Sequence, residues 1–339
     1  MITPEAAWPL PPQGGAAGGR AKPDLRRPLG KPRVVRRVAV TESITPLRGV
    51  PPSLLGESPV WHPLEQVLYW CDIPGHALNR FDPTTGEHKA WPFDTDVACC
   101  APLMEGGLLL ALRTGLVRFD PATGAIEALT DKPPYDPTTE RFNDGKADPQ
   151  GRMWVGTIHE PREPKAALYR YSGGQLEKMA DKITVSNGLA WSADALTMYW
   201  ADTQAHSVYA FDFESAGGAL ANQRVFAKFP PKIADQDLTT YGGRPDGAAV
   251  DRQGGYWIAM FEGARVLRFA PDGSVTREIK LPVRCPTMPC FGGADLKTLY
   301  ITTAREKRPA DELAREPLAG CVLQLRVDVP GLPANMARL

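Results

Sequence analysis

Two kinds of strand-like segment alternate along the chain, and the pair recurs six times. In the first kind, an apolar residue, one or two polar residues and an aromatic or aliphatic residue precede a turn. Such alternation before Gly, Pro or Asp is typical of a strand that enters a tight turn. Its copies are LNRFDPTTG (78–86), LVRFDPATG (116–124), LYRYSGGQL (168–176), VYAFDFESAGG (208–218), VLRFAPDGS (266–274) and VLQLRVDVPG (322–331).

The second kind of segment lies upstream of each copy and has an aromatic or aliphatic core. Successive units are 38 to 58 residues apart, close to the spacing of propeller blades. The pattern predicts an all-β fold, a six-bladed β-propeller with four-stranded blades. Only PADELARE (309–316), in an insertion between strands, is expected to be helical. The six segments are VLYWCDI (67–73), GLLLALR (107–113), RMWVGTI (152–158), TMYWADT (197–203), GYWIAMF (255–261) and TLYITTA (298–304).

The first 33 residues are rich in Pro and Gly and lack periodicity. They are expected to be a disordered basic tail, and residues 34–339 a single propeller domain. VVRRVAV (34–40) alternates enough to form a strand. Pairing of this strand with the last blade would close the ring and remove an exposed edge.

Composition narrows the class of protein further. The formal net charge is zero, but residues 20–37 hold eight Lys and Arg against Asp24 alone, so the remainder is acidic. An acidic body argues against nucleic acid as a partner and agrees with cation binding. No apolar stretch is long enough to span a membrane and no secretory signal begins the chain, so we expect a cytoplasmic protein without a membrane partner. The six cysteines show no C-x-x-C spacing and are expected to be reduced, although sequence leaves a Cys285–Cys290 bridge open.

A third element carries the candidate chemistry. The predicted innermost strands begin with ESPVWHP (57–63), NDGKADP (143–149), NGLAWSA (187–193) and DGAAVDR (246–252). Each of these strands begins with a polar residue and is followed by a tryptophan that we interpret as core between blades. The polar residues Glu57, Asn143, Asn187 and Asp246 lie 13, 11, 13 and 11 positions upstream of Trp70, Trp154, Trp200 and Trp257, respectively. The same count reaches Cys99 and Thr287 in the other two blades, which we expect to line the ring without assigned chemistry.

Repeat-equivalent positions in a propeller converge on one end of the central axis, so these four side chains are expected to form a polar ring. Two carboxylates facing each other in a partly buried channel raise each other's pKa unless a cation lies between them. Their oxygens are hard ligands suited to Ca²⁺, Mg²⁺ or Mn²⁺, with Zn²⁺ or Fe²⁺ also open. One such residue alone would indicate only a strand end or turn. Four in a ring predict an axial site for one divalent cation.

At these residues the sequence resembles the family of senescence marker protein 30 (regucalcin), gluconolactonases and related sugar lactonases. The resemblance spans roughly residues 50–330 and lies in five separated motifs with matching order and spacing. These are LGESPVWHPLEQVLYWCDI (55–73), RFNDGKADPQGRMWVGT (141–157), SNGLAWSADALTMYWADT (186–203), RPDGAAVDRQGGYWIA (244–259) and CFGGADLKTLYITTA (290–304).

The resemblance implies metal ligation by Glu57, Asn187 and Asp246, and substrate contacts from Arg141 and Asn143. The family also places an acidic substrate-binding residue shortly after the G-T of the second motif. Here the text is GTIHEPREP, and the aligned position is Pro161; a one-residue gap gives the role to Glu160. The N-terminal extension of about 45 residues is not a usual family feature.

The sequence thus predicts a divalent-metal-dependent hydrolase that opens a sugar-derived lactone, acting as a monomer or small homo-oligomer. Asp246 is expected to be the catalytic residue, both as ligand and as acceptor of the proton of the attacking water. Two alternatives stay open: an organophosphate or aryl-ester hydrolase on the same scaffold, and a non-catalytic Ca²⁺-binding propeller. A substrate panel separates the first, and the polar axial ring counts against the second.

Overall fold

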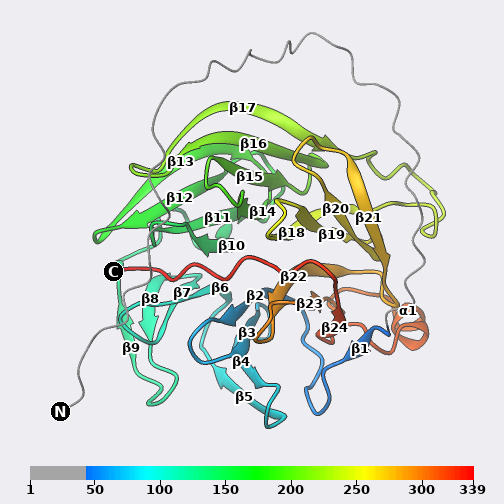
Figure 1. Cartoon of the computed structure of the whole chain (residues 1–339), viewed down its shortest axis with the longest axis horizontal. Helices are drawn as coiled ribbons and strands as arrows, with labels where there is room; N and C mark the ends of the chain where they lie inside the picture. Colours follow the sequence, from blue (N-terminus) through cyan, green and yellow to red (C-terminus); the bar gives the residue numbers. More distant parts are fainter. Residues whose placement is uncertain (1–42) are drawn as a thin grey trace. The chain divides into compact units, whose positions relative to one another are not determined.

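The computed structural model describes residues 43–339, which form six four-stranded antiparallel sheets around a common centre (Figure 1). The predicted six-bladed propeller is confirmed. The predicted tail (1–33) and strand (34–40) lie outside the described residues. None of the described helices is long and apolar enough to cross a membrane.

The first three blades follow one another in chain order, each running from its inner to its outer strand. Blade 1 contains β2 (Gly56–His62), β3 (Val67–Asp72), β4 (Ala77–Asp82) and β5 (Glu87–Pro92). Blade 2 contains β6 (Val97–Pro102), β7 (Leu108–Leu112), β8 (Gly115–Phe119) and β9 (Ile126–Ala128). Blade 3 contains β10 (Glu140–Ala147), β11 (Met153–His159), β12 (Ala166–Ser172) and β13 (Gln175–Ile183).

The next two blades repeat this order, and the sixth takes its outermost strand from the N-terminal side of the chain. Blade 4 contains β14 (Ser186–Trp191), β15 (Thr197–Asp202), β16 (Ser207–Glu214) and β17 (Ala219–Lys228). Blade 5 contains β18 (Arg244–Val250), β19 (Tyr256–Phe261), β20 (Arg265–Phe269) and β21 (Val275–Lys280). Blade 6 contains β22 (Pro286–Gly292), β23 (Thr298–Thr303), β24 (Leu323–Arg326) and β1 (Thr45–Pro46).

Ring closure is made by β1, in which Thr45 pairs with Gln324 and Pro46 with Leu323 of β24. An N-terminal strand therefore joins the last blade, and within the described residues it is Thr45–Pro46. Proline is tolerated there because an edge strand needs fewer backbone donors. The helix α1 (Ala310–Arg315) lies in the insertion between β23 and β24, as the sequence predicted.

Burial follows the radial position of each strand. Inner strands such as β6 and β22 are buried along their whole length, whereas the outer β9 is exposed throughout. The four repeat-equivalent tryptophans are at most 1% exposed and pack in the core, as predicted. Trp154, for example, meets Trp191 and Phe213 edge-on at 6.0 Å.

Two buried aspartates stabilise hairpins and do not belong to the axial ring. The Asp148 carboxylate accepts hydrogen bonds from the backbone N–H groups of Gln150 and Arg152 and from Trp154 Nε1 at 2.8 Å. Asp251 does the same in blade 5, where Trp257 Nε1 donates at 2.7 Å. Because their oxygens are fully engaged, these carboxylates stabilise the turn between the inner and second strands.

Candidate functional site

Each inner strand is irregular at the position that the repeat count singled out. The pairing register with the second strand shifts after Glu57, Val97, Phe142, Asn187, Pro245 and Pro286, respectively. A β-bulge bends the strand and re-aims its side chains. In blades 1 and 4 the residue after the ligand candidate has a positive φ, +47° at Ser58 and +63° at Gly188. A Cβ at Gly188 would lie 2.6 Å from Tyr256 Oη, so this turn requires glycine.

The bulges bring the predicted carboxylates together at the axis. Glu57 and Asp246 are 7% and 5% exposed. Burial raises the pKa of Glu57 well above its usual range, and the charges of Asp246 and Asp144 raise it further. The pKa of Asp246 is likewise raised by burial and by Asp144, against a smaller opposite effect of Arg244. These carboxylates are therefore close enough to repel one another when ionised.

Hydrogen bonds join the two predicted carboxamides and Arg141. Arg141 Nη1 donates to Asn143 Oδ1 at 2.8 Å, and Asn143 Nδ2 donates to Asn187 Oδ1 at 2.9 Å. Asn187 Nδ2 donates to Thr203 Oγ1 at 2.8 Å, which fixes the Asn187 amide. The sequence-predicted Arg141, Asn143 and Asn187 thus form one chain from blade 3 to blade 4. Arg141 lies in β10 with its side chain 11% exposed, so it is not a surface-loop arginine.

Asp144 is a further site residue that sequence reasoning missed. One of its oxygens accepts from the Leu189 N–H at 2.9 Å, while Oδ1 is buried and has no partner among the described residues. Burial raises its pKa, partly offset by Lys146. Regular strand alternation would point Asp144 away from Asn143, but the bulge between Phe142 and Gly145 breaks it. The two consecutive polar residues before Gly145, Asn143 and Asp144, were the sequence feature that could have indicated a second site residue here.

The donor set fits a hard divalent cation. Residues 43–339 contain no cluster of three or more His, Cys, Asp or Glu side chains arranged to hold a metal ion, but carboxamide oxygens such as those of Asn143 and Asn187 are also hard donors. The repulsion between the buried carboxylates and the unpartnered Asp144 Oδ1 are both features that a cation would relieve.

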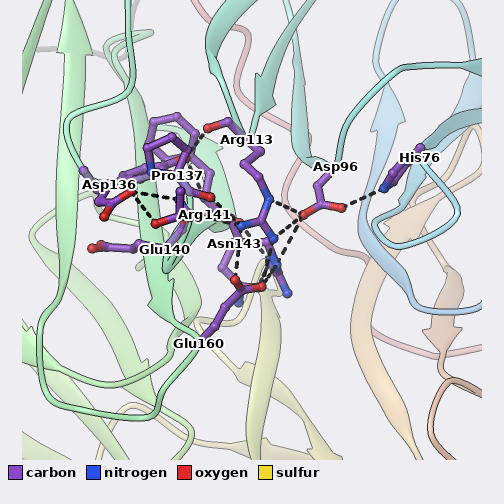
Figure 2. A network of polar contacts seen from close by, with 12 residues as sticks. His76, Asp96, Arg113, Asp136, Pro137, Glu140, Arg141, Asn143 and Glu160 are labelled. Atoms are coloured by element: carbon purple, nitrogen blue, oxygen red, sulfur yellow. Dashed lines mark hydrogen bonds and ion pairs between the residues drawn. The ribbon is translucent and has the colours of Figure 1, made fainter.

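Beside the ring, a charged network contains the remaining predicted residue, Glu160 (Figure 2). Arg113 of blade 2 pairs with Asp96 at 2.7 Å and holds both Glu160 oxygens at 2.8 and 3.1 Å. Arg141 Nε lies 4.0 Å from each of these two carboxylates. The arginine hydrogen bonds lower the pKa of Glu160, which keeps it ionised. Arg113 was not predicted, because its role depends on a contact between blades.

The other two ring positions carry neither a carboxylate nor a carboxamide. Cys99 is fully buried, and burial raises the pKa of its thiol well above the usual range. Thr287 donates its hydroxyl proton to the backbone oxygen of Gly56 and so links blades 6 and 1. Both line the ring as predicted. All six cysteines are free, and Cys285 and Cys290 are not bridged.

A separate cavity of about 290 Å³ is lined by later residues of the inner strands, including Val60, Ala147 and Met288, and by 332–335. The C-terminal segment that contains 332–335 crosses the middle of the propeller (Figure 1, red). The cavity wall includes Lys146, whose Nζ donates to Ala248 O, but neither Glu57 nor Asp246. It is therefore distinct from the polar ring.

Comparisons with known proteins agree with this geometry. A model of the SMP-30/gluconolactonase/LRE-like region matches residues 55–305. A 6-deoxy-6-sulfogluconolactonase of Pseudomonas putida is 44% identical over 291 residues, 83% of this chain and 94% of that protein. Regucalcin of Oryctolagus cuniculus is 35% identical over 290 residues, 82% of this chain and 93% of that protein. The solved structure of a calcium-binding protein, regucalcin from Agrobacterium tumefaciens, matches with a TM-score of 0.79 and 26% identity, covering 85% of this chain and 95% of that one.

Proposed function

Since the chain belongs to the SMP-30/gluconolactonase/LRE-like family, we propose that it hydrolyses a sugar-derived lactone with one divalent cation held by Glu57, Asn187 and Asp246. The observation that carries the proposal is the buried ring, in which the carboxylates of Glu57 and Asp246 repel each other and Arg141 is hydrogen-bonded through Asn143 to Asn187. The lactonase relative supports the reaction. The calcium-binding regucalcin supports a divalent cation, with Ca²⁺, Zn²⁺, Mn²⁺, Mg²⁺ and Fe²⁺ as candidates.

A lactone is an internal ester, so its opening joins a water oxygen to the carbonyl carbon and breaks the bond to the ring oxygen. When bound, the cation polarises the carbonyl and acidifies water. Asp246 accepts the proton that the attacking water loses, and the ring oxygen finally takes up a proton to become a hydroxyl. The reaction therefore gives a single product, the open-chain sugar acid, because the leaving oxygen stays attached to the same molecule.

The remaining site residues hold the sugar. Arg141 is permanently cationic and can donate two hydrogen bonds to sugar hydroxyls or to the new carboxylate. Asn143 is oriented by Arg141 and Asn187. Glu160, ionised beside Arg113, offers acceptors for hydroxyls. The first candidate substrate is 6-deoxy-6-sulfogluconolactone, the lactone for which the Pseudomonas putida relative is named. The unpaired cysteines suit a reducing, cytoplasmic setting.

Removal and return of the cation tests the proposed function. Chelation is expected to lower lactonase activity by roughly a hundredfold or more, because several kcal/mol of activation is lost, and one of the five cations should restore it. The measurement is the rate of acid release from glucono-1,5-lactone and its 6-sulfonated analogue. Full activity after chelation would contradict metal dependence. Hydrolysis of aryl esters or organophosphates but of no lactone would favour the alternative hydrolase.

Replacement of Arg141 by Ala is expected to lower kcat/KM by roughly ten- to a hundredfold, the value of a charge-assisted hydrogen bond to substrate. Metal content, measured by elemental analysis, should not change, since Arg141 is not a ligand. Arg315→Ala is the control, because Arg315 is exposed on α1 and pairs with Asp311. Loss of metal from the Arg141 variant would show that its role is wrongly assigned.

A further inference from the structure

Two arginines near the ring have side chains that donate no hydrogen bond to a carboxylate of residues 43–339. The first is Arg162, in the turn that follows β11. Its backbone has a φ of +66°, and its N–H donates to His159 O at 2.9 Å. Among residues 43–339 its guanidinium makes no hydrogen bond or ion pair. The turn itself is anchored by neighbouring Glu160, whose carboxylate Arg113 holds.

The second is Arg244, the first residue of β18 and two positions before Asp246. Its guanidinium lies 5.1 Å from the Phe261 ring and 3.6 Å from Glu262 Oε2, too far for a hydrogen bond. The other oxygen of Glu262 already accepts from Arg284 and Arg308, both at 3.1 Å.

The two carboxylates beside Arg244 are bound more closely by other arginines. Arg284 and Arg308 also bind Glu312, at 2.9 and 2.7 Å. Three guanidiniums, those of Arg244, Arg284 and Arg308, therefore share the two carboxylates of Glu262 and Glu312. Arg244, which has the longest of these contacts and makes no hydrogen bond to either carboxylate, is the arginine least engaged with them; its charge also acts on Asp246.

The charges of Arg162 and Arg244 act on each other, and Arg162 is exposed to solvent in its turn. Partial burial lowers the pKa of Arg162, and the charge of Arg244 lowers it further. Glu160, the carboxylate that acts in the opposite direction on Arg162, is already held by Arg113. Like charges placed together are unfavourable unless an anion joins them. The arrangement therefore has the electrostatic character of an anion site.

We propose that Arg162 and Arg244 form a subsite for a negatively charged substituent on carbon 6 of the substrate lactone, a sulfonate. This proposal rests on the proposed lactonase function. In a 1,5-lactone, carbon 6 is bonded to carbon 5, which carries the ring oxygen that bonds to the reacting carbonyl carbon. The substituent thus lies only a few bonds from the carbonyl, and Arg244 lies two residues from Asp246. Guanidinium donors match the oxygens of a tetrahedral oxyanion.

Other cations near the ring are already engaged. Arg113 is bound to Asp96 and Glu160, and Arg141 donates to Asn143. Lys146 donates to Ala248 O and is influenced by Asp144. Arg113 and Lys146 would have to give up an existing contact to bind an anion, and the remaining donors of Arg141 are assigned to sugar hydroxyls or the new carboxylate. Arg162 and Arg244 can bind one without such a loss.

The test compares kcat/KM for 6-deoxy-6-sulfogluconolactone, 6-phosphogluconolactone and glucono-1,5-lactone in the wild type, Arg162→Ala and Arg244→Gln. We expect Arg162→Ala to lose roughly ten- to a hundredfold on the sulfonated lactone and less than about twofold on the neutral one. Arg244→Gln should lose more on the sulfonated than on the neutral lactone. Lys165→Ala, which removes a cation of the same turn that is paired with Glu163, is the control and should change neither.

Each outcome bears on the subsite separately from the proposed function. Equal loss on sulfonated and neutral lactones, or no loss on either, overturns the subsite and leaves lactonase activity standing. Preference for the phosphate over the sulfonate overturns the assignment to a sulfonate. If the wild type opens no lactone, the proposed function fails. Calorimetric binding of 6-deoxy-6-sulfogluconate then decides: weaker binding by Arg162→Ala supports the subsite, and equal binding overturns it.

Discussion

Replacement of Asp246 by Ala is expected to lower kcat/KM for lactone hydrolysis by roughly a thousandfold or more. The change removes a ligand charge and a proton acceptor at once, and each role is worth several kcal/mol of activation or about 10² to 10⁴ in rate. Asp246 is buried at the axis and interacts electrostatically with Glu57 and Asp144. The measurement is steady-state kinetics together with metal content. An Asp246→Ala enzyme that binds metal normally and hydrolyses lactones at the wild-type rate would contradict the assignment of Asp246 as ligand and proton acceptor.

Asp246→Asn separates the two roles, because an amide oxygen still ligates but does not accept the proton. Retained metal with lost activity would support the base role. The fold should tolerate both variants, since removal of one of several mutually repelling carboxylates relieves strain in the metal-free protein. Metal-free Asp246→Ala should therefore melt no lower than metal-free wild type. Added metal should raise the melting temperature of the wild type far more. A matched control is Asp251→Ala, which removes a hairpin carboxylate bonded to Trp257 and should lower the melting temperature instead.

Metal affinity is expected to rise steeply with pH, by about tenfold per pH unit for each proton displaced. The pKa values of Glu57 and Asp246 are raised well above their ordinary values of 4.5 and 3.8, first by burial. The folded metal-free protein therefore keeps protons that the unfolded chain has lost. Its stability should fall as pH rises from about 4 through these raised pKa values. The metal-loaded protein should lack this decline, because the cation replaces the protons.

Calorimetry in buffers of different ionisation enthalpy measures the protons released, and melting curves of the metal-free protein measure the stability. Glu57→Gln is the informative variant, since it removes one titrating ligand and keeps an oxygen donor. It should release fewer protons and show a shallower dependence of affinity on pH. An affinity that is constant between pH 5 and pH 8 would contradict the mutual repulsion of the buried carboxylates.

The sequence by itself determined the blades and most of the ring. Each blade repeats the same period-two segments and turn residues, and a closed repeat must place equivalent positions around one axis. Glu57, Asn143, Asn187 and Asp246 were therefore found by counting from tryptophans, although 189 positions separate the first from the last. Their inner-strand positions agree with the structure.

The tertiary structure decided what local patterns do not contain. Asp144 turns to the axis because a bulge breaks strand alternation. Asp251, like Asp246, is a buried aspartate near a glycine in blade 5, yet its oxygens are used by a hairpin and an indole. Arg113 reaches Glu160 from another blade, and the charges of Arg162 and Arg244 act on each other although 82 positions separate them in the sequence. Whether a charged group is satisfied or available depends on partners that are distant in the chain, and only packing of the blades brings those partners together.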